Sequence, residues 1–397
     1  MTLLSPDKLP GIRASLIVGS AAFALAIAGA LFGRDGAAFY RAYLFAYIFW
    51  LGISLGSMGI LMVYHLTGGN WGRLTSRISE AASLTLPLML LLFVPIAFGA
   101  RQLYPWANPD VVAADPVLQH KARVFNIAAV VLRAIVSLGL WSLLAGALRW
   151  LSVARDRRPK PRYGTLFSAL SGLGLVFYFL TMTSAAIDWI MSREPHWYST
   201  VFGIVVIMGQ ALSACSFMIV ALWALRKDEA IAPAIHPETL NDIGNLLLMF
   251  VIFWAYVSFA QLLVTWMGNM QDEVTWYYQR VRGGWQAVSI ALIALHFFVP
   301  FLLLLGQQNK RRIAVLGSLA IGLLALRLLD AAYLVLPTST TELPLPVSWL
   351  DFVTPIGIGG VWMACFRWNL SRQPLLVRVA EETTGRSHAE RSNIATT

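Results

Sequence analysis

Charged and titratable side chains interrupt several long apolar runs of this sequence. A charge near the centre of a bilayer costs at least about 2.5–3.5 kcal/mol, so each such residue calls for a structural or chemical reason. Carboxylates and imidazoles can exchange protons near neutral pH. Ordered by expected depth from the outer to the inner face, the proton-path candidates are Asp188, Asp330, Arg133, His296, Arg327, His65 and Glu80. This order predicts two half-channels for protons, one from each face.

Several of these residues have an equally good structural interpretation. Arg327 and Asp330 lie three positions apart on one helical face, where they would form an ion pair that neutralises itself. Asp330 is equally able to pair with Arg133 from another helix. His296, in the segment ALHFFVPF, is interpreted as a hydrogen-bonded core histidine. The sequence leaves the structural and the proton-conducting interpretations open.

The segment AAIDWIMSREPHWYST, residues 185–200, places Asp188 about one turn inside the end of an apolar run. Helical spacing brings polar residues onto one face of this run, and a short aromatic turn follows it. Together they predict a polar pocket under an aromatic lid, suited to a quinone headgroup or a proton port. The alternative is a capped helix end with Asp188 hydrogen-bonded to the loop. The quinone-pocket candidates are Tyr178, Thr181, Asp188, His196 and Trp197.

The composition defines the elements that must position these residues. The chain has 397 residues, of which 58% are hydrophobic and 13% are charged. A soluble protein cannot bury so much apolar surface, so lipid must surround most of the chain. The net charge of +10 does not indicate nucleic-acid binding, because the basic residues gather between apolar runs. Cys215 and Cys365 lie in separate runs without Cys-x-x-Cys spacing, so neither a thiolate metal site nor a disulfide framework is expected.

Ten apolar runs are long enough to cross about 30 Å of hydrocarbon at about 1.5 Å per residue. They cover residues 13–32, 39–66, 80–100, 122–149, 163–191, 198–225, 240–268, 284–306, 312–336 and 347–369. The first is interpreted as a retained helix, because no small-residue cleavage site follows it. An even number of spans places both termini on one side, and the excess of Lys and Arg there predicts that both are cytoplasmic. The predicted fold is an all-α polytopic membrane protein with ten transmembrane helices.

The second expected span carries Gly52, Gly56 and Gly59 at a spacing that is typical of close helix packing. His65 lies near its inner end, and Glu80 opens the next expected span from the inside. For these two residues, snorkelling to the interface or helix capping is the structural alternative to a proton path.

The expected outer connections are rich in Trp and Tyr. They read RQLYPWANP, SREPHWYS and GNMQDEVTWYYQRVRGGW. One interpretation is an aromatic belt at the level of the lipid headgroups. The other is a docking surface for a partner outside the membrane, since aromatic residues and Arg are enriched in interface cores.

Several common sites are not expected in this chain. A membrane haem b needs two well-placed histidines, and His65 and His296 lie at different expected depths. Neither a nucleotide-binding motif nor a metal-ligand cluster is present in the sequence, so the chain alone has no evident means of carrying electrons. Pro87, Pro95, Pro300 and Pro355 allow the kinks or broken helices of an independent secondary transporter, which is one alternative function.

Six segments in this order resemble a known family. They are GISLGSMGILMVYHLTGGNWG, EAASLTLPLML, LYPWAN, DWIMSREPHWYSTVFG, FWAYVSFAQLLVTWMGN and WYYQRVRGGW. In combination they resemble the ActF family of bacterial alternative complex III, integral membrane proteins with an NrfD/PsrC-like fold. The motifs that match carry Asp188, Glu194, His196 and Trp197 in DWIMSREPHWYST, and His65 in YHLTGG.

The resemblance implies an arrangement of the whole chain. Two four-helix bundles, residues 39–191 and 198–336, would be flanked by one helix within residues 1–38 and another within 337–370, with residues 371–397 as a cytoplasmic tail. The implied location is the bacterial inner membrane. The implied partners are membrane lipid, a related NrfD-like membrane subunit, a periplasmic iron–sulfur subunit and c-type cytochromes, so that the iron–sulfur clusters and haem c belong to the partners.

The resulting hypothesis is a non-redox membrane subunit of a quinol:cytochrome c oxidoreductase that supports assembly and proton translocation. In the family that the chain resembles, the sister subunit is the better-supported quinol site. This favours a proton port over a quinone at Asp188. The alternative is a membrane anchor that itself binds quinone or menaquinone.

Overall fold

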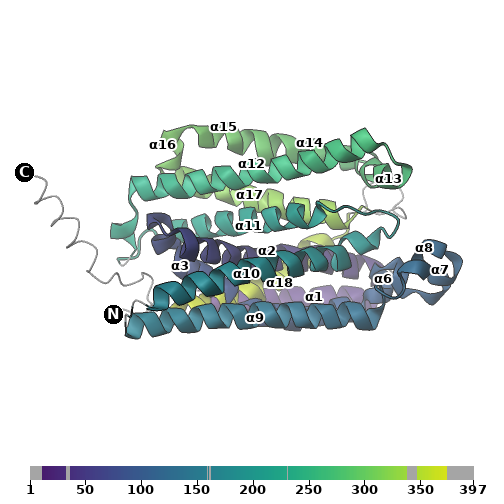
Figure 1. Ribbon diagram of the computed structural model, residues 1–397, viewed down its shortest axis with the longest axis horizontal. Coiled ribbons are helices and arrows are strands. Elements are labelled where there is room, and N and C mark those ends of the chain that lie inside the picture. Colours follow the sequence, from purple (N-terminus) through teal and green to yellow (C-terminus); the bar gives the residue numbers. More distant parts are fainter. Residues whose placement is uncertain are drawn as a thin grey trace, which may run out of the picture.

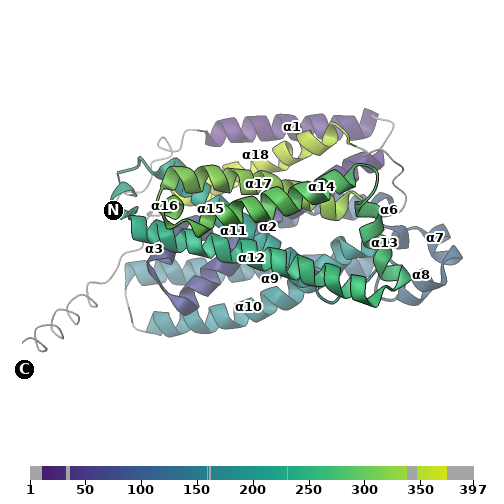
Figure 2. The same cartoon turned by 90° about the horizontal axis from the view of Figure 1, so that it is seen from above.

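The computed structural model describes residues 11–32, 36–158, 160, 162–229, 231–337 and 347–372, and every regular element within them is a helix (Figures 1 and 2). Nine helical stretches of this part are long and apolar enough to cross a membrane. They are α1 (Ile12–Phe32), α2 (Gly36–Thr67), α3–α5 (Asn70–Phe98), α9 (Ile127–Arg157), α10 with the following turn (Arg162–Arg193), α11 (Phe202–Leu225), α12 (Pro237–Gly268), α14–α15 (Trp285–Leu305) and α17 (Ile313–Val335). The predicted all-α polytopic class is confirmed.

The tenth predicted span corresponds to α18 (Leu350–Ser371), which is not among these nine and whose crossing stays a prediction. It packs closely along α1, where Gly19 and Gly360 bring the two backbones together. Predictions that fall on residues 1–10 or on the tail from residue 373 onward lie outside the described residues.

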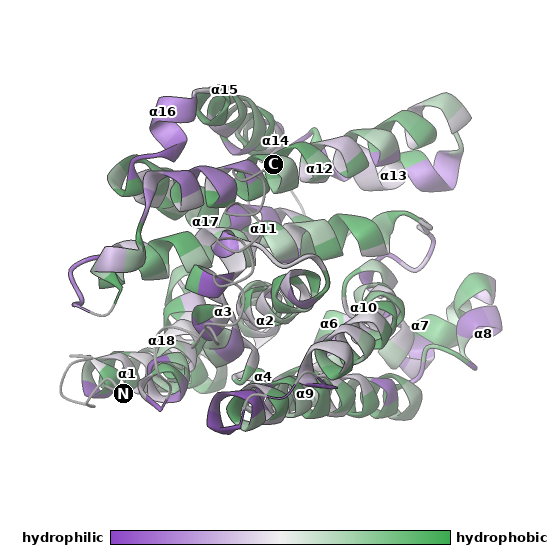
Figure 3. Cartoon of the chain, turned by 60° about the vertical axis from the view of Figure 1, so that its left-hand side comes forward, coloured by the Kyte–Doolittle hydropathy of each residue, from purple (hydrophilic) through white to green (hydrophobic). Residues whose placement is uncertain are grey.

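Helix α2 forms the centre of the protein. It packs against α3, α10, α11, α17 and α18 and is almost entirely buried, whereas the outer helices expose their apolar side chains. Figure 3 shows hydrophobic residues along the long helices and hydrophilic segments at α8 and α16. The glycines of α2 pack closely as predicted, because Gly52 and Gly56 lie against Gln210 of α11 and Gly59 lies against Tyr178 of α10.

Gly56 is the tightest of these contacts, and a Cβ atom there would collide with the main-chain carbonyl of Gln210 and with Ala214. Because α2 and α11 would have to move apart, we expect Gly56→Ala to lower the free energy of unfolding by about 1–3 kcal/mol. Thermal unfolding in detergent measures this loss. Gly139→Ala on α9 is the matched control, since no atom outside its own helix lies within 4 Å of its would-be Cβ. Equal unfolding temperatures for the two variants would contradict the close packing.

The two ends of the helices differ in chemistry. One end, called here the aromatic end, carries α6 (Ala100–Leu103), α7 (Pro109–Ala114), α8 (Pro116–Lys121), residues 190–201 and α13 (Gln271–Arg280). The opposite end, called here the basic end, carries α16 (Gln307–Lys310) and the basic residues Arg155, Arg157 and Arg158. The aromatic end corresponds to the predicted outer side and the basic end to the predicted inner side.

Two helices begin away from their predicted positions. The third span begins at Asn70 rather than residue 80, because the polar residues of α3 (Asn70–Ser83) are packed inside the protein. Helix α9 begins at Ile127 and continues to Arg157 rather than covering 122–149. Arg133 therefore lies near the aromatic end, and its predicted place in the middle of the order of depths is wrong.

Candidate functional site

A buried ionic cluster joins α3 to α9 in the half of the protein nearer the basic end. Glu80 Oε2 accepts hydrogen bonds from Arg77 at 3.0 Å and from Arg149 at 3.1 Å, and its Oε1 accepts one from Ser152 at 2.7 Å. Arg77 also pairs with Asp156 and donates to Ser152 at 2.6 Å. Arg77 is 0% exposed and Glu80 is 2% exposed. The two carboxylates therefore balance the charge of the two guanidinium groups.

This cluster corrects the interpretation of Glu80 as a snorkelling or capping residue. The predicted spans leave Arg77 and Asp156 in polar connections and end at Arg149, so the pairing of these residues with one another and with Glu80 was not predicted. The signal that could have revealed it was the helical spacing, because Arg77 and Glu80 lie three positions apart, and residues 149, 152 and 156 share one face of α9.

Asp188 forms the second ion pair, at the aromatic end. Arg133 approaches it with two parallel hydrogen bonds, from Nε to Oδ2 at 2.7 Å and from Nη2 to Oδ1 at 2.9 Å. This is the bidentate geometry that gives the strongest carboxylate pairs. The partner of Arg133 is thus Asp188, and the predicted alternative pair with Asp330 is wrong. The Asp188 side chain bonds Arg133 rather than the loop, but its main-chain carbonyl accepts a hydrogen bond from Ser192 of the following turn, so the predicted bond between Asp188 and the loop is formed by the main chain alone.

Helix α10 carries a row of polar side chains, each bonded to another helix. Near the basic end, Ser171 lies 3.1 Å from Nδ1 of His65 on α2. Further along, Tyr178 donates to Gln210 of α11 at 2.5 Å, and Thr181 accepts from Trp141 of α9 at 2.8 Å. With Asp188, this row extends along most of α10. The partners lie on three different helices, so the row does not enclose a single ligand pocket.

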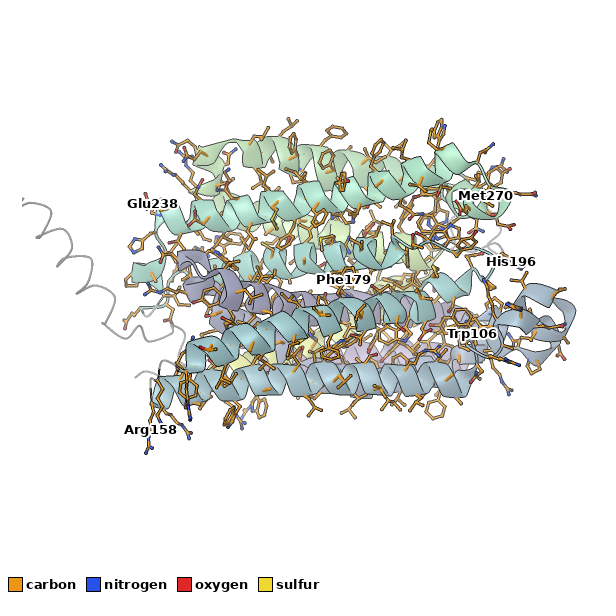
Figure 4. All side chains as sticks on the ribbon, viewed as in Figure 1. Trp106, Arg158, Phe179, His196, Glu238 and Met270 are labelled. Atoms are coloured by element: carbon orange, nitrogen blue, oxygen red, sulfur yellow. The ribbon has the colours of Figure 1, made fainter. Side chains whose placement is uncertain are left out.

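The two lid residues predicted above Asp188 point to other partners. His196 lies at the exposed aromatic end (Figure 4), with Nε2 2.8 Å from Oδ2 of Asp115. Partial desolvation raises the pKa of Asp115, but hydrogen bonds from the Val117 N–H and from His196 outweigh it, and the net pKa lies below the usual value. Trp197 is buried and stacks on Trp276 of α13, with ring centroids 4.9 Å apart. The predicted pocket of Asp188, His196 and Trp197 is therefore not assembled.

Arg327 and Asp330 form a third buried pair, within α17, as the structural interpretation predicted. Arg327 also donates to Ser213 at 3.2 Å and lies directly over Gly209 of α11. His296 is fully buried nearby, with its ring edge-on to Trp254 at 4.1 Å. The interpretation as a core histidine is therefore confirmed, but neither of its ring nitrogens has the expected hydrogen-bond partner among the described residues.

Two arginines that the sequence pattern assigns to the outer side are buried at the end of α17. Arg280 donates to the carbonyls of Tyr333 and Leu334 at 3.1 Å each, and Arg193 donates to the carbonyl of Val335. These are carbonyls of the last turn of the helix, which have no intrahelical partner. Both arginines therefore cap a helix rather than lie in solvent.

The arrangement contains ion pairs and hydrogen-bonded polar groups and, within the described ranges, no group of three or more His, Cys, Asp or Glu side chains placed to hold a metal ion. A scan against protein-family models finds no match for this chain, and a search of the curated proteins finds none either. The quinone, the redox partners and the sister subunit therefore stay predictions.

Proposed function

We propose that this chain is a multi-pass subunit, without a redox centre of its own, of a quinol-oxidising complex in the bacterial inner membrane. Its roles are to support assembly with a related membrane subunit, an iron–sulfur subunit and c-type cytochromes, and to conduct protons. The apolar helices support the membrane location, and the six matching segments support the family. The proposal includes ten crossings arranged as two four-helix bundles with flanking helices.

The distribution of arginines supports an orientation with the basic end in the cytoplasm. Lys and Arg residues prefer cytoplasmic connections. Arg193 and Arg280 count against this orientation in a simple tally, because they belong to the aromatic end. Their guanidinium groups, however, are bound to helix carbonyls, so they carry no information about topology.

The polar row of α10 is the observation that carries the proton-conducting role. Ser171, Tyr178, Thr181 and Asp188 follow at intervals of seven, three and seven residues, which separates successive members by roughly 5–10 Å along the helix. Water molecules would have to bridge these gaps. The row leads from His65, nearer the basic end, to the Asp188 carboxylate at the aromatic end.

Asp188→Asn tests this role in the purified complex reconstituted into vesicles. We expect the complex to assemble and oxidise quinol, with fewer protons moved per electron, because asparagine cannot release a proton. The cost in stability should be small, since the Arg133 side chain is 33% exposed and can turn its charge toward the headgroups.

Asp115→Asn is the control for this measurement. It removes a carboxylate at the same end that is bonded to His196 and lies outside the row on α10. The ratio of protons to electrons should be that of the wild type. An unchanged ratio in Asp188→Asn would exclude Asp188 as a proton port.

A further inference from the structure

A cavity of about 670 Å³ lies toward the aromatic end, among α11, α12, α13, η5 (Leu292–Phe298) and α17. Its volume falls within the range of small-molecule pockets, about 300–1,000 Å³. None of its lining residues belongs to α10. The cavity is therefore separate from the polar row on that helix.

The walls of the cavity combine aromatic rings with a few polar groups. Trp197, Trp254 and Trp276 all line it, and the stacked pair of Trp197 and Trp276 gives a flat surface. Ser289 Oγ and Tyr333 Oη lie 3.1 Å apart on the wall and offer hydroxyl groups. A planar ring with small polar substituents would find both stacking partners and hydrogen bonds here.

The cavity opens sideways rather than toward an end of the helices. Among its lining residues, Tyr256 and Phe259 of α12 and Ile293 and Phe298 of η5 are all more than half exposed. They lie within apolar spans, whose surroundings are lipid. Helix η5 is a π-helix, a rare form that occurs frequently at functional sites. The opening therefore connects the cavity to the acyl chains of the bilayer.

The charge of the lining selects among the molecules of the bilayer. The described lining residues include one carboxylate, Asp330, and none of them is Lys, Arg or His. Asp330 is already paired with Arg327, which does not line the cavity, so no cation of the lining is left to balance the phosphate of a phospholipid headgroup. A bare acyl chain could form no hydrogen bond with the Ser289 and Tyr333 hydroxyl pair. A neutral ring with carbonyl or hydroxyl groups can form hydrogen bonds with the hydroxyl groups of the lining and pack against its aromatic walls, and an apolar tail can extend through the lateral opening.

We propose that this cavity binds the ring of a prenylated quinone or hydroquinone, which enters from the bilayer between α12 and η5. The ring lies against the tryptophans with an oxygen near Ser289 and Tyr333, and the tail extends through the lateral opening. This inference goes beyond the proposed proton conduction and requires no electron transfer by this chain.

Photolabelling tests the proposal on the chain purified in gentle detergent with its native partners. The probe is an azido-benzoquinone with a short prenyl tail, and labelled peptides are mapped by mass spectrometry. We expect label on residues 252–262 and 292–298, removed by excess unlabelled quinone. Label spread over all lipid-facing helices, or label that unlabelled quinone does not displace, would overturn the proposal.

Ala255→Trp fills the cavity from α12 and should reduce the displaceable label about tenfold, through lost contacts and volume. Ala325→Trp is the matched control, because Ala325 is exposed on α17 and does not line the cavity. Thermal unfolding of both variants checks that they fold. Lipid extracted from the wild-type protein gives a second measurement, in which about one bound quinone per chain is expected, and phospholipid without quinone would oppose the proposal. Because no lining residue lies on α10, a failure here leaves the proton ratio of Asp188→Asn unaffected.

Discussion

Glu80→Gln should destabilise the protein more than a typical substitution, by about 3–5 kcal/mol. The substitution removes one of two carboxylates that neutralise Arg77 and Arg149, and Arg77 has no access to water. The Arg77 guanidinium group would keep Ser152 and, of its two carboxylate partners, Asp156, while Arg149 would have lost its carboxylate. Thermal unfolding in detergent and the yield of monodisperse protein measure the loss.

A second substitution separates charge balance from simple loss of contacts. In Glu80→Gln with Arg149→Gln, one positive and one negative charge are removed, and Arg77 keeps Asp156. We expect the double variant to recover a large part of the stability, because an unpaired buried charge costs more than a missing pair. If the double variant is less stable than the single one by the full cost of a second lost contact, the charge-balance explanation is wrong.

The apolar part of this fold could be predicted from the sequence because lipid imposes a length and a composition on each spanning helix. Nine of the ten predicted runs correspond to apolar helices, and the glycines of α2 lie at the expected close contacts. The pairing of Arg327 with Asp330 followed from their spacing within one helix. Each of these features depends on neighbours in sequence or on contact with lipid.

The buried charged residues could not be predicted in the same way. An Arg or Asp that is buried in an ion pair cannot be distinguished by its residue type from an Arg or Asp in a polar loop. The first half of α3 and the last turns of α9 were therefore assigned to connections. Which carboxylate meets which arginine depends on how helices distant in sequence pack. Asp188 was singled out correctly as a charged helix end, but its partner, Arg133, comes from 55 residues earlier in the chain.

For a similar reason, the sequence alone could not show which aromatic residues of the connections are exposed and which are buried. Tyr198 and Tyr278 are exposed, as a belt at the headgroups would require, but Trp197 and Trp276 are buried and stacked. Composition could not separate the two groups. The cavity arises where these buried rings meet α12 and α17, so no single segment of sequence contains it.

Arg280→Met should lower the free energy of unfolding by about 3 kcal/mol or more, since each hydrogen bond to a charged group contributes about 1.5–3 kcal/mol. The guanidinium group of Arg280 is almost fully buried, with its carbon 3.5 Å from the centre of the Trp276 ring. It bonds the carbonyls of Tyr333, Leu334 and Trp276. Methionine fills similar volume but takes the side-chain donor away from the carbonyls of Tyr333 and Leu334. The loss is measured by thermal unfolding.

Arg282→Met is the matched control, because Arg282 lies over the ring of Tyr278 at 3.4 Å yet is exposed. It removes the same charge and a similar ring contact from the same end of the protein, so its effect should be within about 1 kcal/mol of the wild type. Equal losses in the two variants would show that charge or ring stacking, rather than capping of α17, gives Arg280 its effect.

The segment of Arg280→Met that unfolds first shows whether Arg280 stabilises α13 locally or the whole protein. Arg280 connects α13 to the end of α17 through its hydrogen bonds to the α17 carbonyls. Trp276 of α13 also stacks on Trp197, which lies in the connection before α11. Without the guanidinium group, α13 would keep mainly its ring contacts. Limited proteolysis of Arg280→Met should therefore cut first within residues 269–284, before the spanning helices unfold. Because Trp276 and Tyr277 also line the cavity, release of α13 should weaken quinone labelling at the same time, whereas Arg282→Met should leave both the proteolysis and the labelling unchanged.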